Sequence, residues 1–382
     1  MAEWRPAVVF PPGEFLRDEL EARGWTQLEF AEIIGRPPRL VNEIIAGKRG
    51  ISPDTANELA AALGTSSQFW MNLETAYQLW KAAPAPERIS REARLRERFP
   101  VREMIRRGWI EASESFDVLE AQVLHFFNIP SIDAPVQLAH AARRTNDGEI
   151  APGQLAWLCR VKQLAGALQV ASYSETLLHK AVEDLRRLTT APEEIRHVPK
   201  IMAACGVRFV VVEPMPGSKI DGVCSWLEDG TSPVIGLSLR QDRIDNFWFV
   251  LRHEVEHVLR GDGKGADIID SNLGEGDASA GADPVAECAA NNAAAEFLVP
   301  RAKLDNFIAR VRPLYSEQKI INFAKVNGVH PGIVVGQLQN RGEIPYANLR
   351  RHLVKVRHLL ATSALTDGWG STPQVWNTPP VM

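Results

Sequence analysis

IDNFWFVLRHEVEHVLRG, residues 244–261, is the stretch that says most about the fold of this 382-residue chain. Its apolar residues recur at helical spacing, so it predicts a helix with a buried face. Within it, His253-Glu254-Val255-Glu256-His257 matches the pattern H-E-x-x-H. A step of four residues places both imidazoles on one face of a helix, with the glutamate beside the metal ion that they hold. The stretch therefore predicts a metal-binding helix.

The next predicted helix, VAECAANNAAAEFLV at 285–299, offers two candidates for a third metal ligand. Glu287 and Glu296 are nine residues apart, which at 100° per residue places them on opposite faces of a helix. Glu287 shares its face with Asn291, whereas we expect Glu296 to lie toward solvent. A catalytic zinc site has three protein ligands and one open position. We therefore predict a Zn²⁺ site, not distinguished by sequence from manganese or iron, with the ligands His253, His257 and Glu287.

This constellation is typical of peptide hydrolysis. In that interpretation Glu254 is the general base, which accepts a proton from the water that attacks a peptide carbonyl. The strands predicted before the metal helix offer an edge that aligns an extended peptide by main-chain pairing. Two plainer interpretations stay open: a helix whose histidines are only hydrogen-bonded, and a site that binds metal without catalysis.

The rest of the chain is mostly helical in pattern. Runs rich in β-branched residues at 207–213, 222–228 and 232–239 predict a small sheet, and a Gly/Asp/Ser-rich stretch at 261–284 predicts a loop. The fold class is therefore mainly α with a small β-sheet (α+β). Prolines and small residues predict a linker near 82–90. Four segments follow: a helical domain at 10–80, a helical connecting module at 81–200, a metal domain at 201–360 and a disordered tail at 361–382.

The N-terminal segment predicts five short helices between Phe15 and Trp80. Thr26-Gln-Leu-Glu29 is a capping box that opens a helix, and Gly35 ends it. Pro37 and Pro38 open the next helix, where a missing N–H costs nothing. The result is a helix, a sharp turn and a second helix, which is the order of a helix-turn-helix.

In a helix-turn-helix, the second helix enters the major groove of DNA and presents the side chains of its first turns to base edges. Arginine pairs with guanine and asparagine with adenine, so Arg39 and Asn42 are the candidate base readers. Residues 1–80 hold seven Lys+Arg and eleven Asp+Glu, a net charge of 7 − 11 = −4, so attraction to DNA must come from the basic cluster at 36–49. The candidate contacts to phosphates are Gln27, Lys48 and Arg49, and Arg36 is a further candidate DNA-binding residue. A five-helix protein-interaction module is the alternative.

Composition places limits on the function. Apolar residues make up 45% and charged residues 24%, with a net charge of −4, which is the balance of a globular protein and not of a uniformly basic nucleic-acid coat protein. Four cysteines without a C-x-x-C pair are typical of reduced thiols in a cytosol. We find no signal-peptide pattern and no long apolar run, so we expect a cytoplasmic protein without a membrane partner.

Residues 10–80 resemble the HigA-type antitoxin branch of the XRE-family helix-turn-helix regulators. The most specific parts are PGEFL at 12–16, GKRGIS at 47–52 and ALGTSSQFWMNLETAYQLW at 62–80. The resemblance implies binding of operator DNA as a homodimer. One departure is the entry to the second helix, Arg36-Pro37-Pro38, where a polar turn is usual.

From about 200 to 355 the chain resembles the ImmA/IrrE metallopeptidases, which are often fused to an XRE module. The resemblance rests on HEVEH and on Glu287 followed by Asn291 and the ending FLVP at 297–300. It implies the same zinc ligands and the same general base, Glu254, and some members of that family cleave a repressor. The position before His257 is often glycine there but is Glu256 here.

Two hypotheses follow. The first is a DNA-binding regulator whose zinc endopeptidase domain cleaves a protein substrate such as a repressor. The second is a non-enzymatic antitoxin that binds a toxin and represses its own promoter, with a degenerate metal-binding domain.

Overall fold

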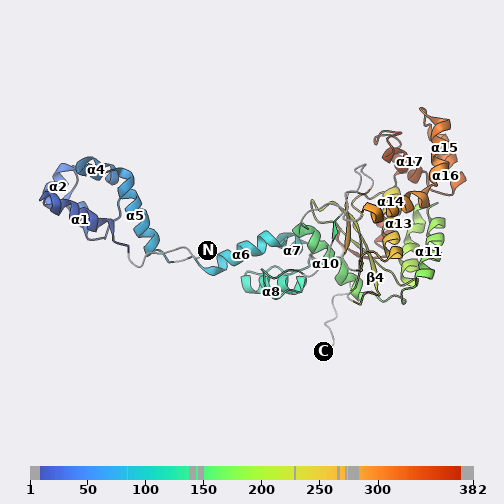
Figure 1. The fold of residues 1–382 in the computed structure, drawn as a ribbon, viewed down its shortest axis with the longest axis horizontal. Coiled ribbons are helices and arrows are strands. Elements are labelled where there is room, and N and C mark those ends of the chain that lie inside the picture. The colour runs from blue at the N-terminus through green and yellow to red at the C-terminus, as the bar shows by residue number, and fades with distance from the viewer. Residues whose placement is uncertain are drawn as a thin grey trace. The chain divides into compact units, whose positions relative to one another are not determined.

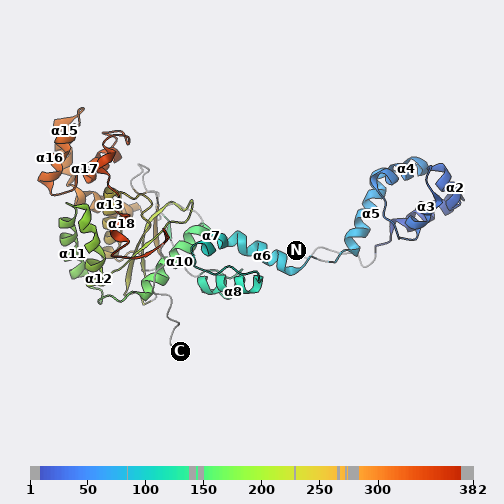
Figure 2. The same cartoon turned by 180° about the vertical axis from the view of Figure 1, so that it is seen from behind.

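The chain forms two compact units, Met1–Ile89 and Ser90–Met382. The computed structural model describes residues 9–83, 85–136, 143–144, 150–227, 229–264, 267–271, 273 and 284–370. The boundary between the units falls in the predicted linker near 82–90. Figures 1 and 2 show the chain from opposite sides.

The first unit is the predicted five-helix domain. Thr26 caps α2 by accepting a hydrogen bond from the Glu29 N–H, and the Glu29 carboxylate accepts one in return from the Thr26 N–H, as the capping box predicts. Apolar side chains such as Leu16, Phe30 and Trp70 are fully buried at the centre of the unit. The helices are α1 (Pro12–Arg23), α2 (Gln27–Ile33), α3 (Pro38–Ile45), α4 (Pro53–Leu63) and α5 (Ser67–Lys81).

The second unit combines a sheet with helices on both of its faces (Figures 1 and 2). The predicted fold class, mainly α with a small sheet, is confirmed. Its helices are α6 (Glu87–Arg98), α7 (Val101–Arg106), α8 (Phe116–Phe127), α10 (Pro152–Ala167), α11 (Glu175–Leu188), η1 (Pro192–His197), α12 (Val198–Ala204), α13 (Ile244–Arg260), α14 (Pro284–Leu298), α15 (Arg301–Val311), α16 (Glu317–Asn327), α17 (Pro331–Asn340), η2 (Arg350–His352) and α18 (Arg357–Leu360). Its strands are β1 (Arg143–Arg144), β2 (Arg208–Val212), β3 (Ile220–Trp226), β4 (Pro233–Leu237), β5 (Ile268–Ser271) and β6 (Leu365–Asp367).

The six strands are ordered β1-β5-β3-β4-β2-β6. The pair β3–β4 and the pair β3–β5 are antiparallel, and the other pairs are parallel. The three predicted runs became β2, β3 and β4. Each of them has a neighbour on both sides, so our prediction that they supply a free edge for a peptide is wrong for this structure.

The central strands alternate between two cores. Phe209 and Val211 of β2 pack with α11, α12 and α13, whereas Val210 and Val212 pack with α10 on the other face. Because both faces are covered, these strands have nearly continuous apolar sequences, the pattern by which they were predicted. The predicted connecting module at 81–200 is thus, from Ser90 onward, part of the second unit, with α10 covering one face of the sheet.

Two further segments differ from the prediction. The predicted loop at 261–284 contains strand β5, which pairs with β3 through backbone hydrogen bonds that composition does not reveal. The predicted disordered tail at 361–382 begins with ordered chain, because β6 pairs with β2. Positions 274–283 and 371–382 lie outside the described residues.

Candidate metal centre

Helix α13 holds the two histidines of the H-E-x-x-H pattern at the centre of the second unit. Its apolar face, with Phe247, Trp248 and Leu251, packs into the core, and His253 and His257 are both 0% exposed. The two side chains lie one turn apart on the same face, with their Nε2 atoms 3.0 Å from each other. The two histidines thus lie on one face of the helix, as the four-residue step predicts, and their Nε2 atoms face the same space.

Glu287 meets the two histidines from helix α14, which packs beside α13. Its carboxylate oxygens lie 3.5 Å from His253 Nε2 and 3.6 Å from His257 Nε2. The other glutamate of α14, Glu296, is exposed and accepts a hydrogen bond from the Arg301 N–H. The helical-face argument that separated the two glutamates thus agrees with the structure.

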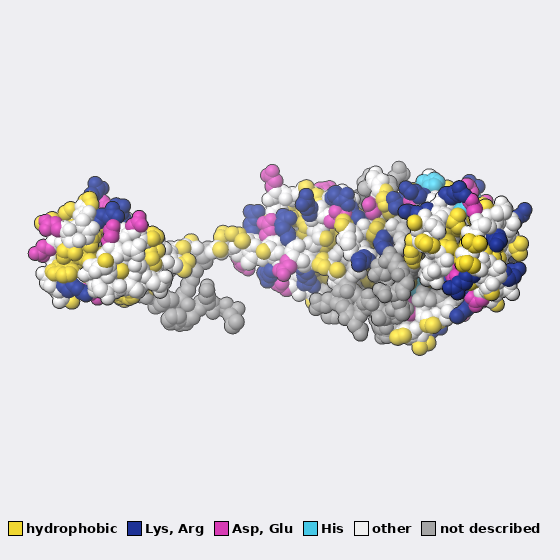
Figure 3. Space-filling view, turned by 90° about the horizontal axis from the view of Figure 1, so that it is seen from above, with side chains coloured by type: hydrophobic (Ala, Val, Ile, Leu, Met, Phe, Trp, Pro, Cys, Tyr) yellow, Lys and Arg dark blue, Asp and Glu magenta, His cyan; other side chains and the backbone are white. Residues whose placement is uncertain are grey.

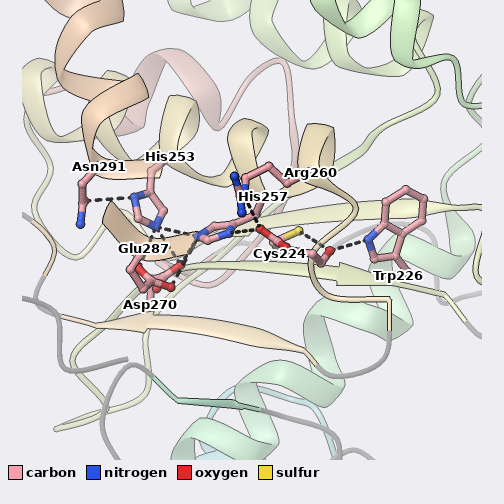
Figure 4. A network of polar contacts seen from close by, with 9 residues as sticks. Cys224, Trp226, His253, His257, Arg260, Asp270, Glu287 and Asn291 are labelled. Carbon is pink, nitrogen blue, oxygen red and sulfur yellow. Dashed lines mark hydrogen bonds and ion pairs between the residues drawn. The ribbon is translucent and has the colours of Figure 1, made fainter. Parts of the chain in front are cut away.

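The outer nitrogens of both imidazoles have hydrogen-bond partners. His257 Nδ1 lies 3.0 Å from Asp262 Oδ2, and His253 Nδ1 lies 3.2 Å from Asn291 Oδ1 (Figure 4). Because a carboxylate only accepts hydrogen bonds, His257 must donate from Nδ1, which leaves the lone pair of a neutral imidazole on Nε2. Outer partners of this kind orient histidine ligands in metalloproteins.

A divalent cation fits this arrangement. His253 Nε2 and His257 Nε2 lie 3.0 Å apart and both face the Glu287 carboxylate, so a positive charge, either a proton or a metal ion, is favoured between them. Glu287 Oε2 is buried without a hydrogen-bond partner among the described residues, so it has a lone pair to offer. Imidazole nitrogen and carboxylate oxygen are ligands that zinc takes in proteins. The predicted set His253, His257 and Glu287 is therefore a chemically complete three-ligand group.

The structure adds a residue that the sequence analysis missed. Asp270 of β5 is fully buried, and its Oδ2 lies 3.3 Å from His253 Nε2 and 3.9 Å from His257 Nε2. Ligand atoms of His253, His257, Asp270 and Glu287 all lie within 4.8 Å of one another. Figure 4 shows Asp270 and Glu287 on the same side of the two imidazoles. We call these four residues the His/Asp/Glu cluster.

Glu254 lies beside the cluster with its carboxylate against strand β3. A Cβ atom on Gly222 of that strand would come within 2.1 Å of Glu254 Oε1, so only glycine leaves room for this carboxylate. Both carboxylate oxygens are buried without a hydrogen bond among the described residues. Burial, together with Asp270 and Glu287, raises the pKa of Glu254 well above its usual value. A carboxyl group in such surroundings takes up a proton readily.

The two carboxylates make the cluster electrically negative. Burial alone would lower the pKa of His253, but Asp270 and Glu287 outweigh it and raise that pKa to about 9. Burial would raise the pKa of Asp270, but the facing histidines hold it below its usual value. Negative surroundings that stabilise a protonated imidazole also favour a metal cation in the same place.

In the first unit, α2 and α3 are joined by a turn at 34–37, as a helix-turn-helix requires. Arg39 and Asn42 lie on the exposed face of α3, whereas Val41 and Ile44 face the core. Gln27, Lys48 and Arg49 are also exposed. All five side chains are thus exposed, as a contact with DNA would require.

Acidic neighbours accompany the basic residues of this surface. Arg39 Nε donates a 2.7 Å hydrogen bond to Glu43, and Arg49 lies 3.7 Å from the same carboxylate. Arg39 lowers the pKa of Glu43 through that hydrogen bond. Arg36 donates to Glu58 of α4 at 2.7 Å. Figure 3 shows Lys and Arg side chains (dark blue) interspersed with Asp and Glu (magenta) on the visible face of each unit.

Comparison with known proteins matches this first unit. A helix-turn-helix family model matches residues 16–70. Virulence-associated protein I of Dichelobacter nodosus is 38% identical over 80 residues, which cover 21% of this chain and 74% of that protein. Antitoxin HigA-1 of Vibrio cholerae is 41% identical over 77 residues, which cover 20% of this chain and 70% of that protein. Among solved structures, Pseudomonas aeruginosa antitoxin HigA with the higBA promoter is 40% identical, covering 19% of this chain and 79% of that chain, with a TM-score of 0.19.

The family model and the two sequence relatives define the class of DNA-binding helix-turn-helix regulators. Within that class, the chain belongs through its N-terminal fifth to the XRE family, where its relatives include a HigA antitoxin. The His/Asp/Glu cluster lies outside the matched residues 16–70. In the part of the chain that the structure describes, no helix has the length and apolar character needed to span a membrane.

Proposed function

We propose that this chain is a DNA-binding regulator whose second unit is a zinc-dependent endopeptidase acting on a protein substrate such as a repressor. The observation that supports it most is the buried convergence of His253, His257 and Glu287, with Glu254 beside them. The resemblance of HEVEH and the following helix to the ImmA/IrrE metallopeptidases agrees with this proposal.

The roles of the residues follow from their positions. His253, His257 and Glu287 would hold the metal, and Asp262 and Asn291 would keep the two imidazoles oriented. A bound zinc ion would supply Lewis-acid chemistry toward a water molecule and a peptide carbonyl. Glu254 would accept the proton of the attacking water and pass it to the amine that leaves when the C–N bond breaks. Gly222 leaves the space in which this carboxylate works.

The first unit would bring this activity to an operator. Two solved relatives from Pseudomonas aeruginosa are complexes with DNA, one with the higBA promoter and one with operator DNA. By analogy, we propose that Arg39 and Asn42 contact base edges, that Gln27, Arg36, Lys48 and Arg49 contact phosphates, and that the chain binds as a homodimer.

Metal content tests the proposed site. We expect near-stoichiometric zinc in wild type purified without chelators or metal-affinity tags, and loss of most of it in His257→Ala and Glu287→Ala, because each removes a ligand. Elemental mass spectrometry per chain is the measurement. Glu296→Ala is the matched control, since it changes the exposed glutamate of the same helix and should keep the metal. A folded wild type without bound metal would contradict the proposal.

The HigA-like relatives favour a second candidate, a non-enzymatic antitoxin that binds a toxin and represses its own operon. Glu254→Gln separates the two functions, because it removes the general base and keeps every proposed metal ligand. The peptidase hypothesis predicts that this variant binds zinc and loses the regulatory output in cells. If the variant keeps that output while Arg39→Ala/Asn42→Ala abolishes repression, the antitoxin hypothesis is the better one.

A further inference from the structure

We propose that Asp270 is a fourth protein ligand of the metal ion, and that strand β5 thereby holds the site closed to substrate in the structure described here. This inference rests on the proposed metal site and adds the way in which that site is regulated. Its basis is the position of one carboxylate and of the strand that carries it.

The first observation is the placement of Asp270 Oδ2. It faces both imidazoles, at 3.3 Å from His253 Nε2 and 3.9 Å from His257 Nε2, distances comparable to those of the Glu287 oxygens at 3.5 and 3.6 Å. The carboxylate of Asp270 therefore lies about as close to the two histidines as that of Glu287, the predicted third ligand. A catalytic zinc site keeps one position open for water or substrate, whereas four protein ligands are typical of a closed site.

The second observation is the path of β5. It pairs with β3 in antiparallel register, and the residue opposite Asp270 is Gly222, the residue that makes room for Glu254. An extended peptide substrate adds to a sheet by the same main-chain pairing. Strand β5 thus occupies the side of β3 where a peptide would lie close to both Glu254 and the histidines.

The third observation is that contacts anchor β5 at both of its ends. Before the strand, the Asp267 carboxylate lies 2.7 Å from Lys162 Nζ and accepts a hydrogen bond from Ser225. After it, the Leu273 N–H donates a 2.8 Å hydrogen bond to Asp221. These contacts keep Asp270 in the cluster. With β5 in this position, His253, Glu254 and His257 are 0% exposed. Access of a protein substrate requires that β5 move away from β3.

Cobalt substitution of the full-length protein tests this inference without relying on peptide cleavage. Co²⁺ in a site of four protein ligands has a visible spectrum that a small competing ligand cannot change. We expect acetohydroxamate to leave the spectrum of the wild-type Co²⁺ protein unaltered and to shift that of Asp270→Asn. We also expect Asp270→Asn to bind Zn²⁺ about tenfold more weakly or worse, since even outer partners of a metal ligand contribute that much. Competition with a chromophoric chelator measures this affinity.

Glu296→Gln is the matched control, because it makes the same carboxylate-to-amide change in an exposed residue of α14 that does not face the histidines. It should keep the wild-type zinc affinity. An unchanged affinity in Asp270→Asn, or a wild-type spectrum that acetohydroxamate shifts, would overturn the inference. If Asp270→Asn does not fold, the effect of acetohydroxamate on the spectrum of the wild-type Co²⁺ protein tests the inference by itself. A wild type that binds no Co²⁺ overturns the proposed metal site as well, whereas an active Glu254→Gln protein counts only against the peptidase.

Discussion

Glu43 stands between two arginines on the exposed side of the helix-turn-helix. It accepts a hydrogen bond from Arg39 and lies near Arg49, so part of the positive charge of this surface is neutralised within the domain. Exposed ion pairs contribute little to stability, so this arrangement matters more for DNA than for folding. The proposed contacts of Arg39 with base edges and of Arg49 with phosphates would require both arginines to turn from Glu43 toward the nucleic acid.

We therefore expect Glu43→Gln to bind double-stranded DNA of arbitrary sequence more tightly than wild type at low salt. Each further phosphate contact should steepen the slope of log K against log salt by about 1. Fluorescence anisotropy over a series of salt concentrations measures both effects. Glu21→Gln on α1 removes the same charge from an exposed residue of another helix and is the control. Equal salt slopes for the two variants would count against a role of Arg49 at phosphates.

Residues whose chemistry depends on helical spacing were predictable from the sequence. His253, His257 and Glu254 follow from one four-residue step, and Glu287 follows from the face that it shares on a second helix. Asp270 could not be found in this way, because its approach depends on the pairing of β5 with β3. A carboxylate brought in by strand pairing leaves no spacing pattern relative to the histidines.

At the scale of elements, the contact between α1 and α3 depends on a glycine. A Cβ atom on Gly13 would lie 2.1 Å from the Ile44 carbonyl oxygen, so the two helices approach each other more closely than any other residue permits. Helix α3 carries Arg39 and Asn42, and its seating on α1 therefore positions the candidate base readers. This close contact is the physical reason for the glycine in PGEFL at the start of α1.

Gly13→Ala should force α1 and α3 apart and destabilise the first unit by roughly 1–3 kcal/mol, the usual cost of overpacking. Hydrogen–deuterium exchange of peptides covering 12–45 measures the local effect, and we expect faster exchange there with no change over α13. Asp18→Ala, on the exposed face of the same helix, is the control and should leave exchange unaltered. Wild-type exchange in Gly13→Ala would contradict the close-contact argument.

Some strands of the sheet are indicated by their own sequence, whereas others are recognised only from the strands with which they pair. Strands β2, β3 and β4 are buried on both faces and rich in β-branched residues, so their composition indicates them. Strands β1, β5 and β6 have two to four residues each, and they lie in the predicted helical module, the predicted loop and the predicted tail, respectively. Their conformation comes from the neighbours with which they pair, and no local pattern reports it.

At the scale of the whole molecule, the second unit is closed by its C-terminal strand. In β6, Asp367 is 1% exposed, pairs with Arg160 of α10 and accepts a 3.0 Å hydrogen bond from the Trp109 indole. Strand β6 therefore connects the sheet to the helices that we had predicted to form a separate connecting module. Local sequence patterns do not reveal this contact, because Arg160 and Asp367 are separated by 207 residues.

Ending the chain after Ala364 should lower the free energy of unfolding of the second unit by about 3–5 kcal/mol or more, because Arg160 loses its buried carboxylate partner. Ending it after Gly370 keeps β6 and should leave stability close to that of the full chain. Urea denaturation followed by far-ultraviolet circular dichroism compares the two truncations. Equal midpoints would mean that β6 contributes nothing to the sheet.

The late position of β6 in the sequence also sets an order of events on the ribosome. The first unit ends at Ile89, whereas the sheet lacks its last strand until residue 367 has been made, 278 residues later. At about 5–20 residues per second, translation of that interval takes roughly 15–60 s. The helix-turn-helix can thus fold, and meet DNA or a second nascent chain, before Glu287 and the closing strand exist.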